Sequence, residues 1–167
     1  RGPTPIQTAL LNGEYKTGTT IFRLTSRLDA GPILAQRELV ILPEDNFGSL
    51  KEKLANISAE LLIEIIPAIK DHSITERPQD ENLASYTHKF SKKDFWINWD
   101  NKIKNIFNQI RAFSPSPGAW TSIHNTNLKI LQAEIYDSSK NDKPGTIAGF
   151  IKNKGILVNC QDGQLLI

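Results

Sequence analysis

The sequence predicts an α/β region followed by a smaller β-rich domain. In residues 1–72, segments rich in β-branched residues alternate with helical segments whose apolar residues recur every three or four positions. In residues 94–167, one helix precedes four β-like runs separated by turn sequences. This spacing is typical of a small barrel, for which we expect an OB-like fold. Residues 73–93 are polar and turn-rich, and we interpret them as the linker between the two domains.

A short helix and a strand are predicted at the start of the chain. Thr4 is a favoured N-cap, Pro5 suits the first helical position, and Gly13 suits the left-handed position after a helix end. Residues 19–25 then contain three threonines and one isoleucine, which favour a strand because they are β-branched. A polar loop is expected after this strand.

A second strand and a long helix are predicted next. Residues 33–42 are an apolar run bounded by prolines, as in a strand. The helix that follows has one apolar stripe at helical spacing, formed by Leu50, Leu54, Ile57, Leu61, Ile65 and Ile69. Pro67 lies inside this pattern and lacks a backbone donor, so we expect a kink or a break near Glu64.

An amphipathic helix is predicted to open the second domain. Asp100 or Asn101 can cap it, and prolines and a glycine in residues 114–118 end it. Its apolar stripe consists of Ile103, Ile106, Phe107, Ile110 and Phe113. Strands are expected over Ala119–Ile123, Leu128–Tyr136, Gly145–Lys152 and Ile156–Cys160. Residues 155–167 indicate a hairpin whose second strand stops as it begins, so we expect the domain to be truncated there.

Composition excludes several classes of protein. The longest apolar stretch, residues 61–69, is interrupted by Glu64 and is far shorter than the roughly 20 residues of a membrane-spanning helix. The N-terminus lacks the apolar segment of a signal peptide. The single cysteine, Cys160, fits the reducing cytoplasm, and the dispersed histidines predict no metal site. Methionine is absent, so we expect the chain to be a piece of a longer protein.

Basic residues are concentrated in one region. Residues 88–131 carry seven basic and two acidic side chains, although the net charge of the chain is only +2. Such a region is typical of phosphate-backbone binding, and it is also typical of an ordinary solvated surface. The candidates are Lys89, Lys92, Lys93, Lys102, Lys104, Arg111 and Lys129.

One carboxylate lies in the loop between the two predicted strands of the first domain. Asp29 follows the first strand, in the sequence Leu-Asp-Ala-Gly-Pro. Loops at the carboxyl ends of strands usually carry the chemistry of α/β proteins, which makes Asp29 a candidate acid. The alternative is that Asp29 only caps its own backbone.

Several motifs, taken together in order and spacing, resemble the folate-dependent formyltransferases. In the first domain these are Arg-Gly-x-x-Pro-Ile-Gln, Thr-Gly-x-Thr-Ile and Leu-Asp-x-Gly, at residues 1–7, 17–21 and 28–31. Downstream motifs are similar to the methionyl-tRNA formyltransferases of that superfamily, at residues 79–81, 84–86, 89–94, 97–99, 110–113, 115–119 and 128–130. The resemblance implies that the first domain is the second half of a Rossmann-like catalytic domain.

The resemblance also implies a reaction and its residues. A formyl group would move from 10-formyltetrahydrofolate to the amino group of methionyl initiator tRNA, in translation initiation. Asp29 would be one of three catalytic polar residues, keeping a histidine charged and orienting a water that takes the amine proton. The residues in contact with the folate would be Thr25, Ser26, Arg27 and Leu28. The basic residues named above would face tRNA phosphates, and we expect a cytoplasmic monomer without a membrane partner.

One departure from the family pattern is important. The superfamily's catalytic asparagine and histidine precede its Arg-Gly motif, and this chain starts at Arg1. We therefore expect the chain to be inactive by itself. Two alternatives remain open, a sugar-amine formyltransferase and a non-catalytic RNA-binding module built on the basic second domain.

Overall fold

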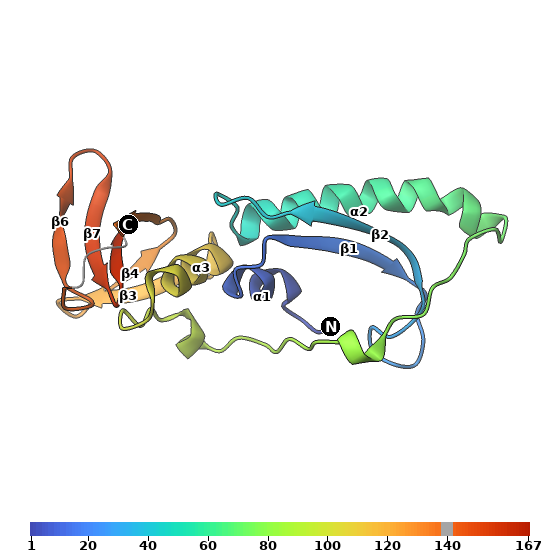
Figure 1. The fold of residues 1–167 in the computed structure, drawn as a ribbon, viewed down its shortest axis with the longest axis horizontal. Helices are drawn as coiled ribbons and strands as arrows, with labels where there is room; N and C mark the ends of the chain where they lie inside the picture. The colour runs from blue at the N-terminus through green and yellow to red at the C-terminus, as the bar shows by residue number, and fades with distance from the viewer. Residues whose placement is uncertain (138–141) are drawn as a thin grey trace.

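The first part of the molecule is an antiparallel strand pair that packs beside a long helix (Figure 1). The computed structural model describes residues 1–137 and 142–167. The elements of this part are α1 (Pro5–Leu11), β1 (Lys16–Phe22), β2 (Ile33–Val40) and α2 (Phe47–Lys70). Both strands contact α2. The predicted mixture of helix and strand is confirmed, whereas a Rossmann-like arrangement is not, because β1 and β2 pair antiparallel.

The ends of α1 follow the prediction in part. Pro5 opens the helix, and Gly13 follows it with a left-handed φ of +67°. Thr4, by contrast, makes no capping hydrogen bond. Its hydroxyl donates instead to the carbonyl of His88 over 2.8 Å, which ties the start of the chain to the linker.

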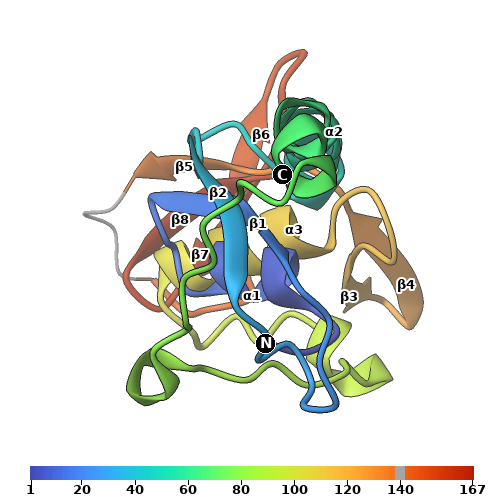
Figure 2. The same ribbon diagram turned by 90° about the vertical axis from the view of Figure 1, so that its right-hand side faces the viewer.

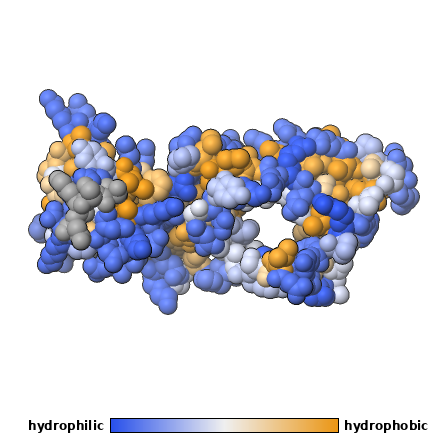
Figure 3. Space-filling view, viewed as in Figure 1, coloured by the Kyte–Doolittle hydropathy of each residue, from blue (hydrophilic) through white to orange (hydrophobic). Residues whose placement is uncertain are grey.

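α2 is continuous from Phe47 to Lys70 and passes through Pro67, so the expected break near Glu64 is wrong. Pro67 lies close to the helix end, where the loss of one backbone hydrogen bond leaves the preceding turns intact. The predicted apolar stripe faces the strands, and three of its members, Leu50, Leu54 and Leu61, are buried. Other apolar side chains of α2 stay exposed, namely Leu62, Ile63 and Ile66. Figure 3 shows apolar surface in the region of this helix.

A buried carboxylate holds the turn before α2. Asp45 is 1% exposed, and its Oδ1 accepts from Lys53 Nζ (2.7 Å) and from Ser49 Oγ (2.8 Å). Its Oδ2 accepts from the amide of Leu42 over 3.0 Å. Burial by itself would raise the pKa of Asp45, but these hydrogen bonds outweigh burial and hold the pKa below its ordinary value of 3.8.

Acid is expected to destabilise the molecule partly through this carboxylate. A depressed pKa in the folded state stabilises the fold above pH 3.8, and the contribution is lost as the pH falls through the lower folded value. We expect Asp45→Asn to lower the free energy of unfolding at pH 7 and to flatten its pH dependence below pH 3.8. Urea unfolding at several pH values measures this. Asp100→Asn, at an exposed position, should keep the wild-type slope, and an equal flattening in both variants would contradict the assignment.

The described residues of the second part form one helix and six strands. They are α3 (Ile103–Phe113), β3 (Ala119–Ile123), β4 (Thr126–Ile130), β5 (Glu134–Asp137), β6 (Ile147–Ile151), β7 (Gly155–Cys160) and β8 (Gly163–Leu166). β3 and β4 form one hairpin, and the other strands form an antiparallel sheet in the order β5-β8-β7-β6. The run that predicted one strand over residues 128–136 is divided between β4 and β5. The expected OB-like barrel is not confirmed, because these two sheets do not close on each other within the described ranges.

α3 connects the two parts. Its Ile110 belongs to the apolar core of the second part, whereas the buried Ala112 packs with Leu10 and Leu50 in the core of the first part. The predicted caps, Asp100 and Asn101, do not cap this helix. The amide of Ile103 donates instead to Oδ1 of Asp162 over 2.6 Å, from the turn between β7 and β8.

The structure bears on three features that were considered from composition: the cysteine, membrane-spanning helices and metal ligands. Cys160 is fully buried in β7, and burial raises the pKa of its thiol to about 11. No helix in the described ranges is long and apolar enough to cross a bilayer. Within residues 1–137 and 142–167, no group of three or more His, Cys, Asp or Glu side chains is placed to hold a metal ion.

The linker runs back along the first part of the molecule. After α2 the chain turns and returns beneath β1 and α1 before it reaches α3 (Figures 1 and 2). Two short 3₁₀ turns interrupt it, η1 (Glu81–Leu83) and η2 (Lys92–Phe95). Arg77 and Ile33 exchange two backbone hydrogen bonds of 2.7 and 2.9 Å, and the amide of Thr87 donates to the carbonyl of Arg1 over 2.7 Å. The linker is thus bonded to the first part at both of its ends.

Candidate active site

The Asp29 loop, residues 23–32, connects β1 to β2. The amide of Arg23 donates to the carbonyl of Pro32 over 3.0 Å and closes the base of the loop. Gly31 is buried beside the Arg23 carbonyl, and a Cβ at this position would clash with that oxygen. Only glycine therefore fits here, which explains the glycine of the Leu-Asp-x-Gly motif.

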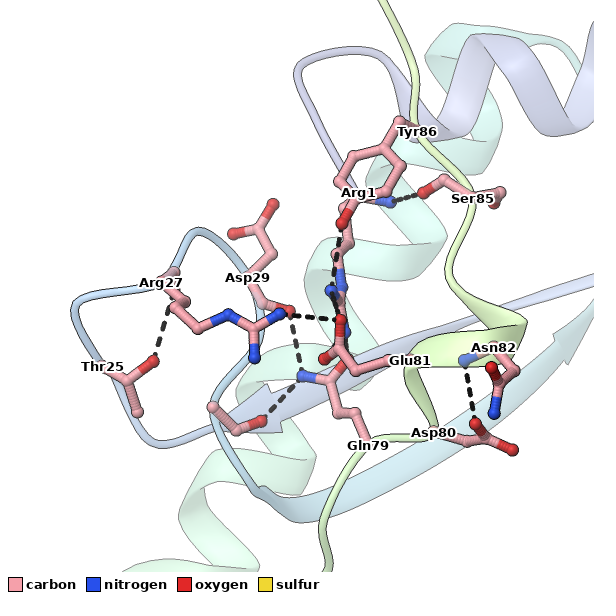
Figure 4. A network of polar contacts seen from close by, with 11 residues as sticks. Arg1, Thr25, Arg27, Asp29, Gln79, Asp80, Glu81, Asn82, Ser85 and Tyr86 are labelled. Carbon is pink, nitrogen blue, oxygen red and sulfur yellow. Dashed lines mark hydrogen bonds and ion pairs between the residues drawn. The ribbon is translucent and has the colours of Figure 1, made fainter.

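Asp29 itself has an unusual backbone conformation. Its φ is +50°, in the left-handed region that aspartate tolerates better than most residues. Its Oδ2 accepts a hydrogen bond from the amide of Gly2 over 3.2 Å. Within the described ranges Oδ1 has no hydrogen-bond partner, and the carboxylate points away from Arg27 and Gln79 in Figure 4. One oxygen of the predicted acid is therefore held while the other is available to a reactant.

The predicted folate contacts form the exposed outer part of the same loop. Thr25, Ser26, Arg27 and Leu28 are all exposed. Leu28 is 73% exposed, and the neighbouring Leu24 is 85% exposed. The hydroxyl of Thr25 donates to the carbonyl of Arg27 over 3.2 Å. The backbone amides of residues 25–28 have no hydrogen-bond partner in the part of the chain that the structure describes. Free amides beside apolar side chains suit a planar heteroaromatic ring with polar edges, and a pterin has these properties.

An arginine–carboxylate pair lies beside the loop (Figure 4). Arg1 donates from Nη1 and Nη2 to the two oxygens of Glu81, over 2.9 Å each. Arg1 also donates to the hydroxyl of Tyr86 (3.3 Å), and Arg27 donates to Glu81 (3.1 Å). The bidentate hydrogen bonds from Arg1 hold the pKa of Glu81 below its ordinary range, and the same pair raises the pKa of Arg1. Both groups therefore stay charged at neutral pH.

Gln79 joins this pair to the Asp29 loop. Its Nε2 donates to the carbonyls of Asp29 (3.0 Å) and Gly31 (2.7 Å), and its Oε1 accepts from Arg1 (3.2 Å). Sequence reasoning noted Gln79 and Glu81 only as parts of a motif and gave them no role. The sequence marks both residues by a polar motif in an otherwise irregular linker. The motif does not reveal their partners, because Asp29 lies 50 positions before Gln79 and Arg1 lies 80 positions before Glu81.

The basic residues predicted to face tRNA fall into two groups. Six lysines are exposed, namely Lys89, Lys92, Lys93, Lys102, Lys104 and Lys129. Arg111 lies instead at the junction of the two parts, where its Nη1 donates to the carbonyls of Leu42 (3.1 Å) and Pro43 (2.8 Å). Burial lowers the pKa of Arg111, and its guanidinium stacks 5.1 Å from the ring centre of Phe107. This position favours a role for Arg111 in holding α3 against the first part.

Comparison with known sequences connects both parts to one family. Residues 1–66 match the family model described as formyl transferase, and residues 89–167 match the model of the formyl transferase C-terminal domain. The chain is 42% identical over 167 residues to the methionyl-tRNA formyltransferase of Dictyoglomus turgidum, covering 99% of this chain and 53% of that protein. It is 39% identical over 164 residues to that of Staphylococcus aureus strain MW2, covering 98% and 52%. The chain thus spans about half the length of the curated relatives it matches.

Solved structures share the fold at lower identity. HypX from Aquifex aeolicus, solved in complex with tetrahydrofolic acid, superposes with a TM-score of 0.78 and 20% identity over 100% of this chain and 29% of that chain. An N-formyltransferase from Helicobacter canadensis, solved with folinic acid and dTDP-3-aminofucose, has a TM-score of 0.77 and 22% identity over 99% and 60%. The chain therefore belongs to the formyl transferase family, and within that family it is similar to the methionyl-tRNA formyltransferases.

Proposed function

We propose that this chain is part of an enzyme that transfers a formyl group from 10-formyltetrahydrofolate to the amino group of methionyl initiator tRNA. The observation that carries the proposal is the 42% identity to a methionyl-tRNA formyltransferase, which continues over 99% of the chain. The likeness includes the linker and the second part. The Helicobacter canadensis N-formyltransferase shares the fold over 99% of this chain at only 22% identity, so the level of identity, and not the presence of the second part, favours the tRNA enzyme.

The proposed role of Asp29 follows from the chemistry of the transfer. The substrate amine attacks the formyl carbon of 10-formyltetrahydrofolate and loses a proton as the new bond forms. The bond between that carbon and N10 breaks, and N10 takes up a proton as tetrahydrofolate leaves. A carboxylate can take the amine proton through an ordered water, or can hold a neighbouring cationic donor in place. Asp29 suits this role because the Gly2 amide fixes Oδ2, whereas Oδ1 has no partner among the described residues.

The outer part of the Asp29 loop is the proposed contact for the folate. The free amides of Ser26 and Leu28 can bind the polar edge of a pterin, and the exposed side chains of Leu24 and Leu28 can cover its face. Two details of the same segment support a preformed surface. The Thr25 hydroxyl bonds within the loop, and Arg27 is bonded to Glu81 of the linker.

Substrate competition tests the proposed function. The full-length protein should transfer formyl from 10-formyltetrahydrofolate to charged initiator tRNA and leave dTDP-linked amino sugars unmodified. The sugar substrate is the competing outcome, because the Helicobacter canadensis enzyme has the same fold and was solved with dTDP-3-aminofucose. Transfer to the sugar but not to the tRNA would contradict the proposal, and tRNA binding without any transfer would indicate an RNA-binding module.

The exposed lysines are the proposed tRNA contacts. We expect Lys92→Ala combined with Lys93→Ala to weaken tRNA binding without regard to sequence and to reduce the slope of log affinity against log salt by about one per lost phosphate contact. Filter binding at several salt concentrations measures both quantities. The matched control combines Lys51→Ala and Lys70→Ala, two exposed positions on α2. Equal salt slopes in the two double variants would contradict the assignment. Arg111 is left out of this interface because its donors bind carbonyls of the first part.

A further inference from the structure

We propose that Gln79 is a positioning residue, which holds the Asp29 loop in the conformation that presents the carboxylate to the reactants. This inference rests on the proposed function and adds a residue of the linker to the machinery of the same site. Gln79 touches no reacting group in this arrangement, because its amide binds only the backbone of the loop and the side chain of Arg1.

The hydrogen-bonding groups of the Gln79 amide are occupied in a way that fixes its orientation. Nε2 uses its two hydrogens on the carbonyls of Asp29 (3.0 Å) and Gly31 (2.7 Å), and Oε1 accepts from Nη2 of Arg1 (3.2 Å). A reversed amide would place its oxygen against two carbonyl oxygens and its hydrogens against a guanidinium. Figure 4 shows the amide lying between the loop and Arg1.

The Gln79 backbone is held on both sides. Two residues earlier, Arg77 exchanges two backbone hydrogen bonds with Ile33, at the point where β2 begins. Two residues later, Glu81 binds Arg1 through both carboxylate oxygens. Gln79 is therefore a rigid support for the loop, whose own outer segment makes few internal hydrogen bonds.

The loop needs such support at the residues that Gln79 binds. Asp29 has a φ of +50°. An L-residue adopts this conformation at a cost in free energy, which hydrogen bonds to the surrounding structure can offset. Gly31 is pressed against the Arg23 carbonyl. Loss of the Gln79 amide would leave the carbonyls of Asp29 and Gly31 without these donors, and the loop would then spend less time in the conformation that aims Oδ1 outward.

The test compares Gln79→Ala and Gln79→Glu with Asn82→Ala in the full-length protein. Glutamate keeps the size of the side chain but cannot donate at neutral pH, and Asn82 is an exposed linker amide whose side chain makes no bond among the described contacts. Both Gln79 variants should lower kcat by about 10²-fold, the size of the effect when a reacting group is misplaced by about 1 Å. The KM for tRNA and the urea midpoint should stay at their wild-type values, and Asn82→Ala should match wild type throughout.

A second measurement does not depend on activity. Trypsin cleavage at the Arg27–Leu28 bond, followed by mass spectrometry relative to cleavage after Lys152, reports how often the loop leaves its bound conformation. Both Gln79 variants should be cleaved faster there, and this would support positioning even if the wild type transferred no formyl group to tRNA. Unchanged cleavage at Arg27, a parallel loss of tRNA affinity and stability, or, where the wild type transfers formyl groups, an unchanged kcat would each overturn the proposal.

Discussion

Replacing Asp29 by asparagine is expected to lower kcat for formyl transfer to methionyl initiator tRNA by about 10²–10⁴-fold, the usual contribution of an acid–base residue. Asparagine has nearly the same shape and still offers an oxygen to the Gly2 amide, which donates to Asp29 Oδ2 over 3.2 Å. It carries no negative charge and cannot take up a proton. Steady-state formylation by the full-length protein measures the effect, and tRNA affinity should hold because the lysines are untouched.

The matched control for this variant is Asp100→Asn. Asp100 is an exposed aspartate of the second part, and its substitution removes the same charge without touching the Asp29 loop. We expect wild-type turnover from it. Turnover near the wild-type level in Asp29→Asn would refute the catalytic role and would favour the alternative in which Asp29 only shapes the turn.

Replacing Phe113 by alanine is expected to lower the free energy of unfolding by about 3–5 kcal/mol. Phe113 is 1% exposed, so the substitution leaves a cavity where α3 ends. Its ring packs edge-to-face against Phe90 and Phe95, with centroids 5.1 and 4.9 Å away, and these contacts are also lost. Urea unfolding followed by circular dichroism measures the difference.

Phe150→Ala provides the control, because Phe150 is 74% exposed in β6 and its truncation leaves no cavity. We expect a change within about 0.5 kcal/mol for that variant. α3 contributes residues to both apolar cores, so Phe113→Ala should shift one common transition. Two transitions, with only one of them displaced, would contradict this coupling.

Local patterns predicted most helices and strands but not their limits. The strand expected over residues 19–25 lies at Lys16–Phe22, because pairing with β2 selects the register, in which Lys16 lies opposite Val40. The cap of α3 comes from Asp162, 59 residues beyond the amide that it binds. No local preference of Asp100 or Asn101 contains that information. The predicted barrel was not confirmed because the spacing of turns predicts strands but does not determine whether the sheets close into a barrel.

The sequence predicted only the part of the candidate site that lies within one short segment. Asp29 and residues 25–28 were predicted because their motif lies within a single loop. Gln79, Arg1 and Glu81 act through contacts between positions 50 to 80 residues apart, which a single sequence does not pair. Arg111 was grouped with the surface lysines by charge alone, since its burial depends on how α3 meets the Pro43 turn.

The pairing of the linker with the first part limits how these proteins can be recombined. A chimera joined at residue 72 would take its linker from the other parent. The described partners of Arg1 lie in that linker, so all of them would be exchanged. The Arg1 side chain is only 8% exposed in its pair with Glu81. A crossover after Thr87 keeps Arg77, Gln79 and Glu81 with the loop that they contact. Residues 73–87 should therefore be exchanged together with the first part, and the exchangeable second module begins where the chain approaches α3.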